Sequence, residues 1–102
     1  MTEQNKLDSF DSYTGDWLIA QEVDKNKGYV CKNVGLDEEG KLVLTIENRG
    51  VSKKTSLNLT NVKKCMEFVK KPTELTGKII YFYTVETQKG PGIRISDIVS
   101  PK

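Results

Sequence analysis

Apolar and polar residues alternate along most of the chain, a pattern typical of β-strands that bury one face. The segment 77–86 differs because it is apolar on both faces, which favours a central strand. Glycine-containing turns separate the alternating segments. The alternation predicts strands over residues 16–23, 28–34, 41–47, 77–86 and 92–98, and a short segment at 54–59 that can pair with the third strand as a hairpin.

One segment, residues 61–71, has helical spacing instead. Its apolar positions fall at i, i+3, i+4 and i+7 and form a single stripe: Val62, Cys65, Met66 and Val69. Thr60 or Asn61 can cap the start of this helix, and Pro72 ends it.

The order of these elements is that of an OB-fold, in which a helix between the third and fourth strands covers one end of a five-stranded barrel. We therefore predict a mainly β, OB-fold-like barrel at residues 15–102, a single domain that follows a flexible N-terminal arm at 1–14. An SH3-like barrel with an inserted helix and an open α+β sheet have the same number of elements and stay as alternatives. The predicted core is Val62, Met66, Val69, Leu44, Ile46, Ile80, Phe82 and Ile95.

Three short motifs follow one another between Leu57 and Ile98: L-N-x-T-N before the helix, G-K-x-I in the central strand and G-I-R-I in the last strand. In these motifs the chain resembles a group of small OB-like proteins encoded by phages and prophages. It departs from their pattern at Leu75, where many members have tryptophan, and at Phe82, where they have leucine. The resemblance implies a protein of a mobile element, near replication or recombination functions, and supplies no catalytic residue. The matching residues are Leu57, Asn58, Thr60, Asn61, Gly77, Lys78, Ile80, Gly92, Ile93 and Arg94.

The composition excludes several kinds of active site. The chain has no histidine, so a Ser/His/Asp or Cys/His nucleophile cannot form, and Cys31 and Cys65 alone cannot complete a tetrahedral zinc site. We interpret both thiols as small buried hydrophobic groups, because disulfides are uncommon in a reducing compartment. The acidic run 37–39 is short and lies in one turn, which favours a solvated loop tip over a metal site. We therefore expect no enzymatic activity, no cofactor and no metal.

The N-terminal segment and the lengths of the apolar runs bear on location. No run approaches the roughly 20 apolar residues that span a bilayer, and the first ten residues are too polar for a signal peptide. These features predict a cytoplasmic protein without a membrane partner. The sequence leaves the oligomeric state open, and a homo-oligomer is compatible with it.

Charge is distributed unevenly along the chain, although the net charge is only +2. Residues 1–50 contain ten acidic and six basic residues, a balance of −4. Residues 51–102 contain four acidic and ten basic residues, a balance of +6. This asymmetry favours a basic face that meets phosphate or an acidic partner, with a merely solvated surface as the alternative.

An OB barrel binds oligonucleotides on strands two and three, between the loops that join strands one and two and strands four and five. In the predicted barrel these loops are 24–28 and 86–92, and both carry lysine. We expect Tyr29 to stack a base, with packing at the barrel edge as the alternative, and we expect Trp17 in the core. The predicted nucleic-acid-binding residues are Lys25, Lys27, Tyr29, Lys32, Arg49, Lys53, Lys54, Lys89 and Arg94.

Two functions from different classes follow from these features. The first is a non-enzymatic module that binds nucleic acid, with single-stranded DNA favoured because OB grooves accept unstacked bases. The second is a protein-interaction factor of a mobile element, an inhibitor or adaptor that acts on a host protein. A continuous basic groove across strands two and three favours the first function, whereas dispersed lysines beside an exposed apolar patch favour the second.

Overall fold

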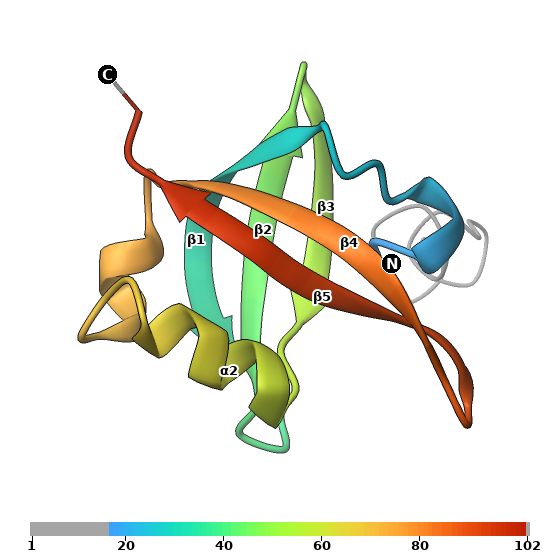
Figure 1. Ribbon diagram of the computed structural model, residues 1–102. Coiled ribbons are helices and arrows are strands. Elements are labelled where there is room, and N and C mark those ends of the chain that lie inside the picture. Colours follow the sequence, from blue (N-terminus) through green and yellow to red (C-terminus); the bar gives the residue numbers. More distant parts are fainter. Residues whose placement is uncertain (1–16, 102) are drawn as a thin grey trace, which may run out of the picture.

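The computed structural model describes residues 17–101, and the arm predicted at 1–14 lies outside the described residues. The described part of the chain forms five strands, one α-helix and two short 3-10 turns (Figure 1). Their bounds are η2 (Ala20–Glu22), β1 (Gly28–Leu36), β2 (Leu42–Asn48), β3 (Val51–Ser56), α2 (Leu59–Met66), η3 (Pro72–Leu75), β4 (Ile79–Thr87) and β5 (Gly90–Val99).

The strands form a single antiparallel sheet in the order β3-β2-β1-β4-β5. The sheet is curved, so that the β4–β5 hairpin crosses in front of β1, β2 and β3 (Figure 1). The mainly β class and the single α-helix between β3 and β4 are confirmed. The sheet is not closed into a barrel, because β3 and β5 do not pair with each other in the part of the chain that the structure describes.

The strand predicted over residues 16–23 is wrong. Trp17 forms only an isolated bridge to Lys54, and the chain then turns through η2. Leu18 donates one backbone hydrogen bond to the Lys54 carbonyl at 2.9 Å, after which the Ile19 carbonyl accepts from Glu22 N at 2.9 Å and closes the turn. The alternating pattern failed here because a segment needs a continuous partner to form a strand, and this one has a single point of pairing.

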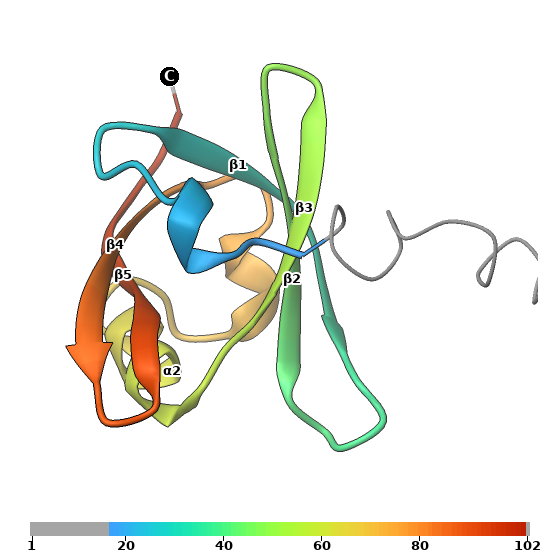
Figure 2. The same ribbon diagram turned by 90° about the vertical axis from the view of Figure 1, so that its right-hand side faces the viewer.

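The 17–22 segment instead fills the gap between the two edges of the sheet. Figure 2 shows this segment between the β4–β5 hairpin and β3. Leu18 is its buried residue, 7% exposed, whereas Trp17 and Ile19 remain 37% and 41% exposed. A segment that covers a sheet edge in this way protects it from pairing with other chains.

Asn61, at the start of α2, covers part of the other edge. Its side-chain Nδ2 donates to the Ile93 carbonyl at 3.0 Å, and its Oδ1 accepts from the backbone N–H of Ile95 at 3.1 Å. One amide thus takes the place of a neighbouring strand for the middle of β5. These two bonds attach α2 to the sheet and orient the helix.

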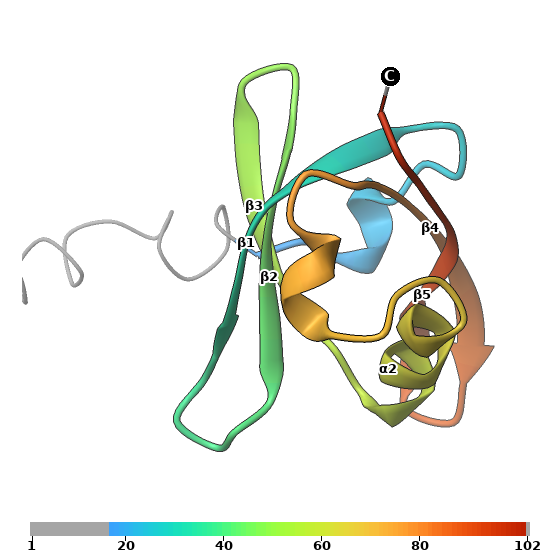
Figure 3. The ribbon, with the colours of Figure 1, turned by 90° about the vertical axis from the view of Figure 1, so that its left-hand side faces the viewer.

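The core lies between the β1–β2–β3 part of the sheet and the β4–β5 hairpin. Figure 3 shows α2 and η3 on one side of this space. The predicted core positions Leu44, Ile46, Ile80, Phe82 and Ile95 are all buried, as are both free cysteines. The buried hydrophobic residues are Leu18, Tyr29, Cys31, Leu44, Ile46, Leu57, Cys65, Leu75, Ile80, Phe82, Ile95 and Ile98.

The helix presents a different face from the one we predicted. Met66 is 70% exposed, and Val62 and Val69 are only partly buried against the core. The buried helix positions are Asn61 and Cys65, one turn apart, because the bonds of Asn61 to β5 fix the rotation of the helix. The helix also ends at Met66, which places Val69 beyond it.

The motif residues behind the phage-protein resemblance stabilise the fold. Asn58, rather than Thr60 or Asn61, is the N-cap of α2, and its Oδ1 accepts from Asn61 N at 2.9 Å. Gly77 has a φ of 89°, a conformation that favours glycine, and its N–H donates to the Cys31 carbonyl at 2.7 Å. The L-N-x-T-N and G-I-R-I motifs meet directly, because Asn61 bonds on both sides of Arg94.

Candidate nucleic-acid interface

The loop that we expected between the first two strands lies elsewhere. The turn with Lys25 and Lys27 precedes β1, because the segment before it is not a strand. Lys27 and Arg49 line one hollow of about 370 Å³ beside Asp24. Lys25 is exposed outside the lining of this hollow. The structure thus brings Lys27 and Arg49 together at this hollow. The hollow does not belong to the loop between strands one and two, where the prediction placed Lys27.

The true β1–β2 connection is acidic. It contains Asp37, Glu38 and Glu39, and the Asp37 carboxylate accepts hydrogen bonds from the backbone N–H groups of Glu39 at 2.8 Å and Lys41 at 2.9 Å. Lys89 lies in the β4–β5 turn, as predicted from the sequence. Of the two loops that frame an OB surface, one therefore repels phosphate and the other attracts it.

Lys53 and Lys54 lie on opposite faces of β3. Lys53 pairs with Ile46 on the core side, and its Nζ lies 3.2 Å from Glu22 Oε2 with only 13% of the side chain exposed. Lys54 is exposed and pairs with Thr45 on the outer side. The two lysines therefore do not form one basic patch, and the ion pair with Glu22 neutralises Lys53.

Tyr29 is in the core and is not available to stack a base. It is 3% exposed and packs edge-to-face against Phe82, with ring centroids 5.9 Å apart and an interplanar angle of 69°. The Lys27 ammonium lies 5.4 Å from the Tyr29 ring centroid and covers the tyrosine. The stacking role predicted for Tyr29 is wrong, because the β1 register turns this residue inward beside Cys31.

The outer face of β1, β2 and β3 carries a different aromatic group. Asn33, Thr45 and Lys54 form one row across the three strands, and the bridge to Trp17 extends it. A shallow hollow of about 290 Å³ opens over this row. We call it the outer hollow, and its lining residues are Trp17, Asn33, Gly35, Leu36, Asp37, Val43, Thr45 and Lys54.

Trp17 is the functional candidate that the sequence analysis placed wrongly. It is the only tryptophan of the chain and is 37% exposed beside Lys54. A β-bulge between Cys31 and Asn33 shifts the β1 register and brings Asn33 into the same row. The feature of the sequence that could have indicated this exposure is the position of the tryptophan, at the start of a short segment that has no adjacent strand to pair with along its length in the described part of the chain.

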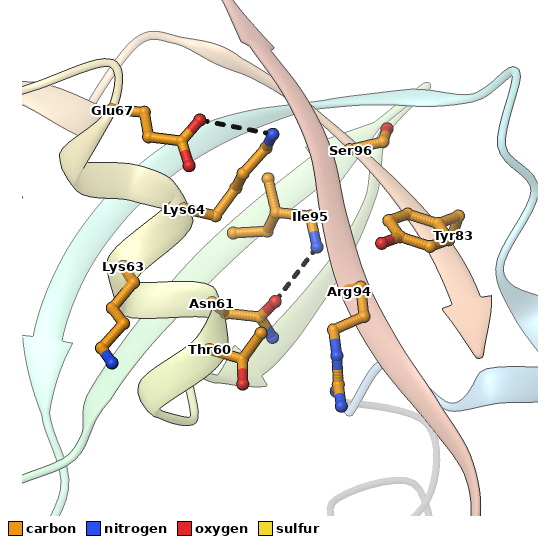
Figure 4. A pocket seen from close by; sticks show the side chains of 9 residues that line it. All are labelled: Thr60, Asn61, Lys63, Lys64, Glu67, Tyr83, Arg94, Ile95 and Ser96. Atoms are coloured by element: carbon orange, nitrogen blue, oxygen red, sulfur yellow. Dashed lines mark hydrogen bonds and ion pairs between the residues drawn. The ribbon is translucent and has the colours of Figure 1, made fainter. Parts of the chain in front are cut away.

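A second group of cationic residues lies beside α2 (Figure 4). Arg94 on β5 projects into a groove of about 440 Å³, and Tyr83, 39% exposed, is its cross-strand neighbour on β4. Lys64 lies 3.5 Å from Glu67 in an ion pair. We call this the α2 groove, and its lining residues are Thr60, Asn61, Lys63, Lys64, Glu67, Tyr83, Arg94, Ile95 and Ser96.

The described residues offer no arrangement for metal or thiol chemistry. Within 17–101, no three His, Cys, Asp or Glu residues lie close enough together to hold a metal ion. Burial raises the pKa of the Cys31 thiol, against a smaller opposing effect of a hydrogen bond to Asn33. Burial, and then the neighbouring Cys31, raise the pKa of Cys65 to about 11. Both thiols are therefore protonated at neutral pH and poor nucleophiles.

Exposed apolar residues gather at α2 and just beyond it. Leu59 and Met66 are 68% and 70% exposed, and Phe68 is 41% exposed with the Lys64 ammonium 5.8 Å from its ring centroid. No helix among residues 17–101 is long and apolar enough to cross a membrane. These side chains are the part of the described surface best suited to an apolar partner.

Comparison of the chain with models of known protein families, with curated proteins and with solved structures found no match. The resemblance to phage-encoded proteins stays a prediction that rests on three short motifs. The residues that carry it cap α2, join it to β5 and continue the pairing of β1, as described above. The motifs therefore bear on the fold more than on the binding chemistry.

Proposed function

We propose that this protein is a non-enzymatic module that binds single-stranded DNA through the outer hollow, and that it serves a phage or another mobile element. The described basic residues do not form the continuous groove expected of this function, and the observation that carries the proposal is instead Trp17, an exposed aromatic ring beside Lys54 on the outer face of the strands. The strand order and the helix between β3 and β4 support an OB-like fold with one open seam. In OB-folds, oligonucleotides bind on the face of strands two and three.

The chemistry of the hollow suits unpaired bases. A base can stack on Trp17, an interaction worth about 1–3 kcal/mol per base that tolerates any base. Lys54 lies next to it for the phosphate backbone, and Asn33 and Thr45 offer hydrogen-bonding groups in the same row. The hollow is shallow and open, a shape that can admit a flexible strand.

Tryptophan fluorescence tests the proposal directly, because Trp17 is the only tryptophan. Oligothymidylate should quench this fluorescence, and the anisotropy of a labelled oligonucleotide should rise over the same concentrations. Trp17→Ala should weaken binding by about 1–3 kcal/mol at every salt concentration, since stacking releases no counterions. Lys54→Gln should instead reduce the slope of log affinity against log salt by about 0.7.

Phe68→Ala provides the matched control. Phe68 is as exposed as Trp17 but lies beyond the end of α2, outside the outer hollow. Its removal should leave oligonucleotide affinity unchanged. A parent protein that binds no oligonucleotide at low salt would refute the proposed function.

A second candidate function, interaction with a host protein, is favoured by the exposed apolar side chains of Leu59 and Met66. In that case the protein acts as an inhibitor or adaptor and α2 contacts the partner. Leu59→Lys combined with Met66→Lys should abolish co-purification of a specific host protein. The same variant should leave the quenching of Trp17 fluorescence by oligothymidylate unchanged. If the host protein still co-purifies with this double variant, α2 is not the contact surface.

A further inference from the structure

We infer that a bound strand continues from the outer hollow, across the gap between β3 and β5, into the α2 groove. This inference rests on the proposed function, because it takes the outer hollow as one end of the path. Another hollow, of about 480 Å³, lies in the gap between β3 and β5; we call it the gap hollow. Its lining residues come from 17–21, Thr55, Ser56, Asn58, Asn61 and 91–94.

Shared residues make the three hollows continuous. Trp17 lines both the outer hollow and the gap hollow. Arg94 and Asn61 line both the gap hollow and the α2 groove. A chain that leaves Trp17 can therefore follow the 17–21 segment through the gap hollow to Arg94. The 17–22 segment, which lies where a closed barrel would pair β3 with β5, forms one wall of this route.

Charge favours this direction over the opposite one. On its other side the outer hollow is lined by Asp37 of the β1–β2 connection, and Glu38 and Glu39 follow it; these carboxylates repel a phosphate backbone. Among residues 17–101, no acidic residue lines the gap hollow. Of the described residues that line the α2 groove, one is acidic, Glu67, and three are basic, and Glu67 is paired with Lys64.

The α2 groove, like the outer hollow, combines an aromatic and a basic side chain. Tyr83 and Arg94 supply this pair in the α2 groove, whereas Trp17 and Lys54 supply it in the outer hollow. No carboxylate among residues 17–101 forms an ion pair with Arg94, whose Nη1 makes one long hydrogen bond of 3.4 Å to the Ile93 carbonyl. Its remaining N–H groups can donate to phosphate. Tyr83 is 39% exposed beside it and can stack a second base (Figure 4).

Oligonucleotides of two lengths separate this inference from the proposed function. OB-folds bind about 4–16 nucleotides, so oligothymidylates of about 4 and about 12 nucleotides should reach the outer hollow alone and the whole path, respectively. The test variant is Lys63→Gln with Arg94→Gln, and the matched control is Lys70→Gln with Lys71→Gln. The control removes the same charge from exposed lysines that lie outside the three hollows.

The expected result depends on length. For the long oligonucleotide, the test variant should lose at least about tenfold in affinity near 0.05 M salt, and the salt slope should fall by about 1.4, or about 0.7 for each lost phosphate contact. The short oligonucleotide should bind the parent, the test variant and the control alike, as measured by Trp17 quenching. Arg94→Lys, which keeps the charge, should retain most of the slope.

Three results would overturn the inference while leaving the proposed function intact. These are an unchanged affinity of the test variant for the long oligonucleotide, an equal loss for both lengths, and an equal loss in the control variant. The last two would indicate a general electrostatic effect rather than a path. A parent protein whose Trp17 fluorescence responds to neither length would instead refute the proposed function, and the inference with it.

Discussion

Replacing Asn61 with alanine tests whether one side-chain amide stabilises the open edge of β5. The side chain is 4% exposed, and its amide bonds to the Ile93 carbonyl at 3.0 Å and the Ile95 N–H at 3.1 Å. Alanine leaves the buried Ile95 N–H without its acceptor, which costs about 1–3 kcal/mol, and water compensates only partly for the lost bond to Ile93, at about 0.5–1.5 kcal/mol. We therefore expect the free energy of unfolding to fall by about 2–4 kcal/mol.

A loss of this size is large for a small domain, whose total stability is about 5–15 kcal/mol. Urea unfolding followed by circular dichroism measures it, with the change in Trp17 fluorescence as a second probe of two-state behaviour. Thr60→Ala is the matched control, because Thr60 is an exposed residue on the same turn of α2. Asn58→Ala removes the N-cap and should cost about 1 kcal/mol, less than the loss at Asn61.

Asn61→Asp adds a finer test. Aspartate keeps an acceptor for Ile95 N–H but places a second acceptor against the Ile93 carbonyl, so it should still destabilise the domain. An unfolding free energy of Asn61→Ala within about 0.5 kcal/mol of that of Thr60→Ala would show that the Asn61 amide does not stabilise the β5 edge. The stability of the β5 edge would then depend on the packing of α2 and the 17–22 segment.

Three further predictions concern other parts of the molecule. Met66→Asp should lower the free energy of unfolding in urea by less than about 1 kcal/mol, because Met66 is 70% exposed and an acid near a helix C-terminus is only mildly unfavourable. If this variant is unfolded, Met66 belongs to the core after all. The Cys31 and Cys65 thiols should react slowly with a disulfide reagent at pH 8 until the protein unfolds, and rapid reaction of the native protein would contradict their burial. The backbone N–H groups of residues 71 and 70, in that order, lower the pKa of Glu74, so its carboxylate stabilises the fold at neutral pH and this contribution is lost as pH falls through the lowered pKa. Glu74→Gln should thus be less stable than the parent at pH 7, with the difference shrinking in acid; a difference independent of pH would exclude the carboxylate as its cause.

Local patterns predicted β1, β2, β4 and β5, which have continuous partners, but placed β3 at 54–59 rather than at Val51–Ser56. The alternation around Leu44 and Ile46 identifies β2, and both residues are buried because each faces the core from a strand paired on both sides. The two apolar faces of the predicted 77–86 segment likewise identify β4 (Ile79–Thr87), which lies between β1 and β5. Periodicity sufficed there because the burial of alternate side chains and the pairing of the backbone favour the same conformation.

The position of Trp17 could not be predicted in this way. Its segment has the alternation of a strand, but the outcome depends on the space left between β3 and β5, which are far from it in sequence. The same holds for Tyr29, whose inward orientation follows from the register of β1 against β2 and β4. A shift of one residue in register exchanges the two faces, and the sequence pattern around a short bulged strand does not set that register.

Local sequence patterns were enough to predict the mainly β class, the single α-helix before the last strand pair and the five buried core positions on β2, β4 and β5. These properties depend on composition and on periodicities within one segment. The tertiary structure decided that the sheet stays open, that Asn61 rather than a strand bonds to β5, and that Trp17 lies on the surface near Arg94. The physical reason is that each of these features depends on contacts between segments distant in sequence, whose hydrogen bonds and packing override local preference.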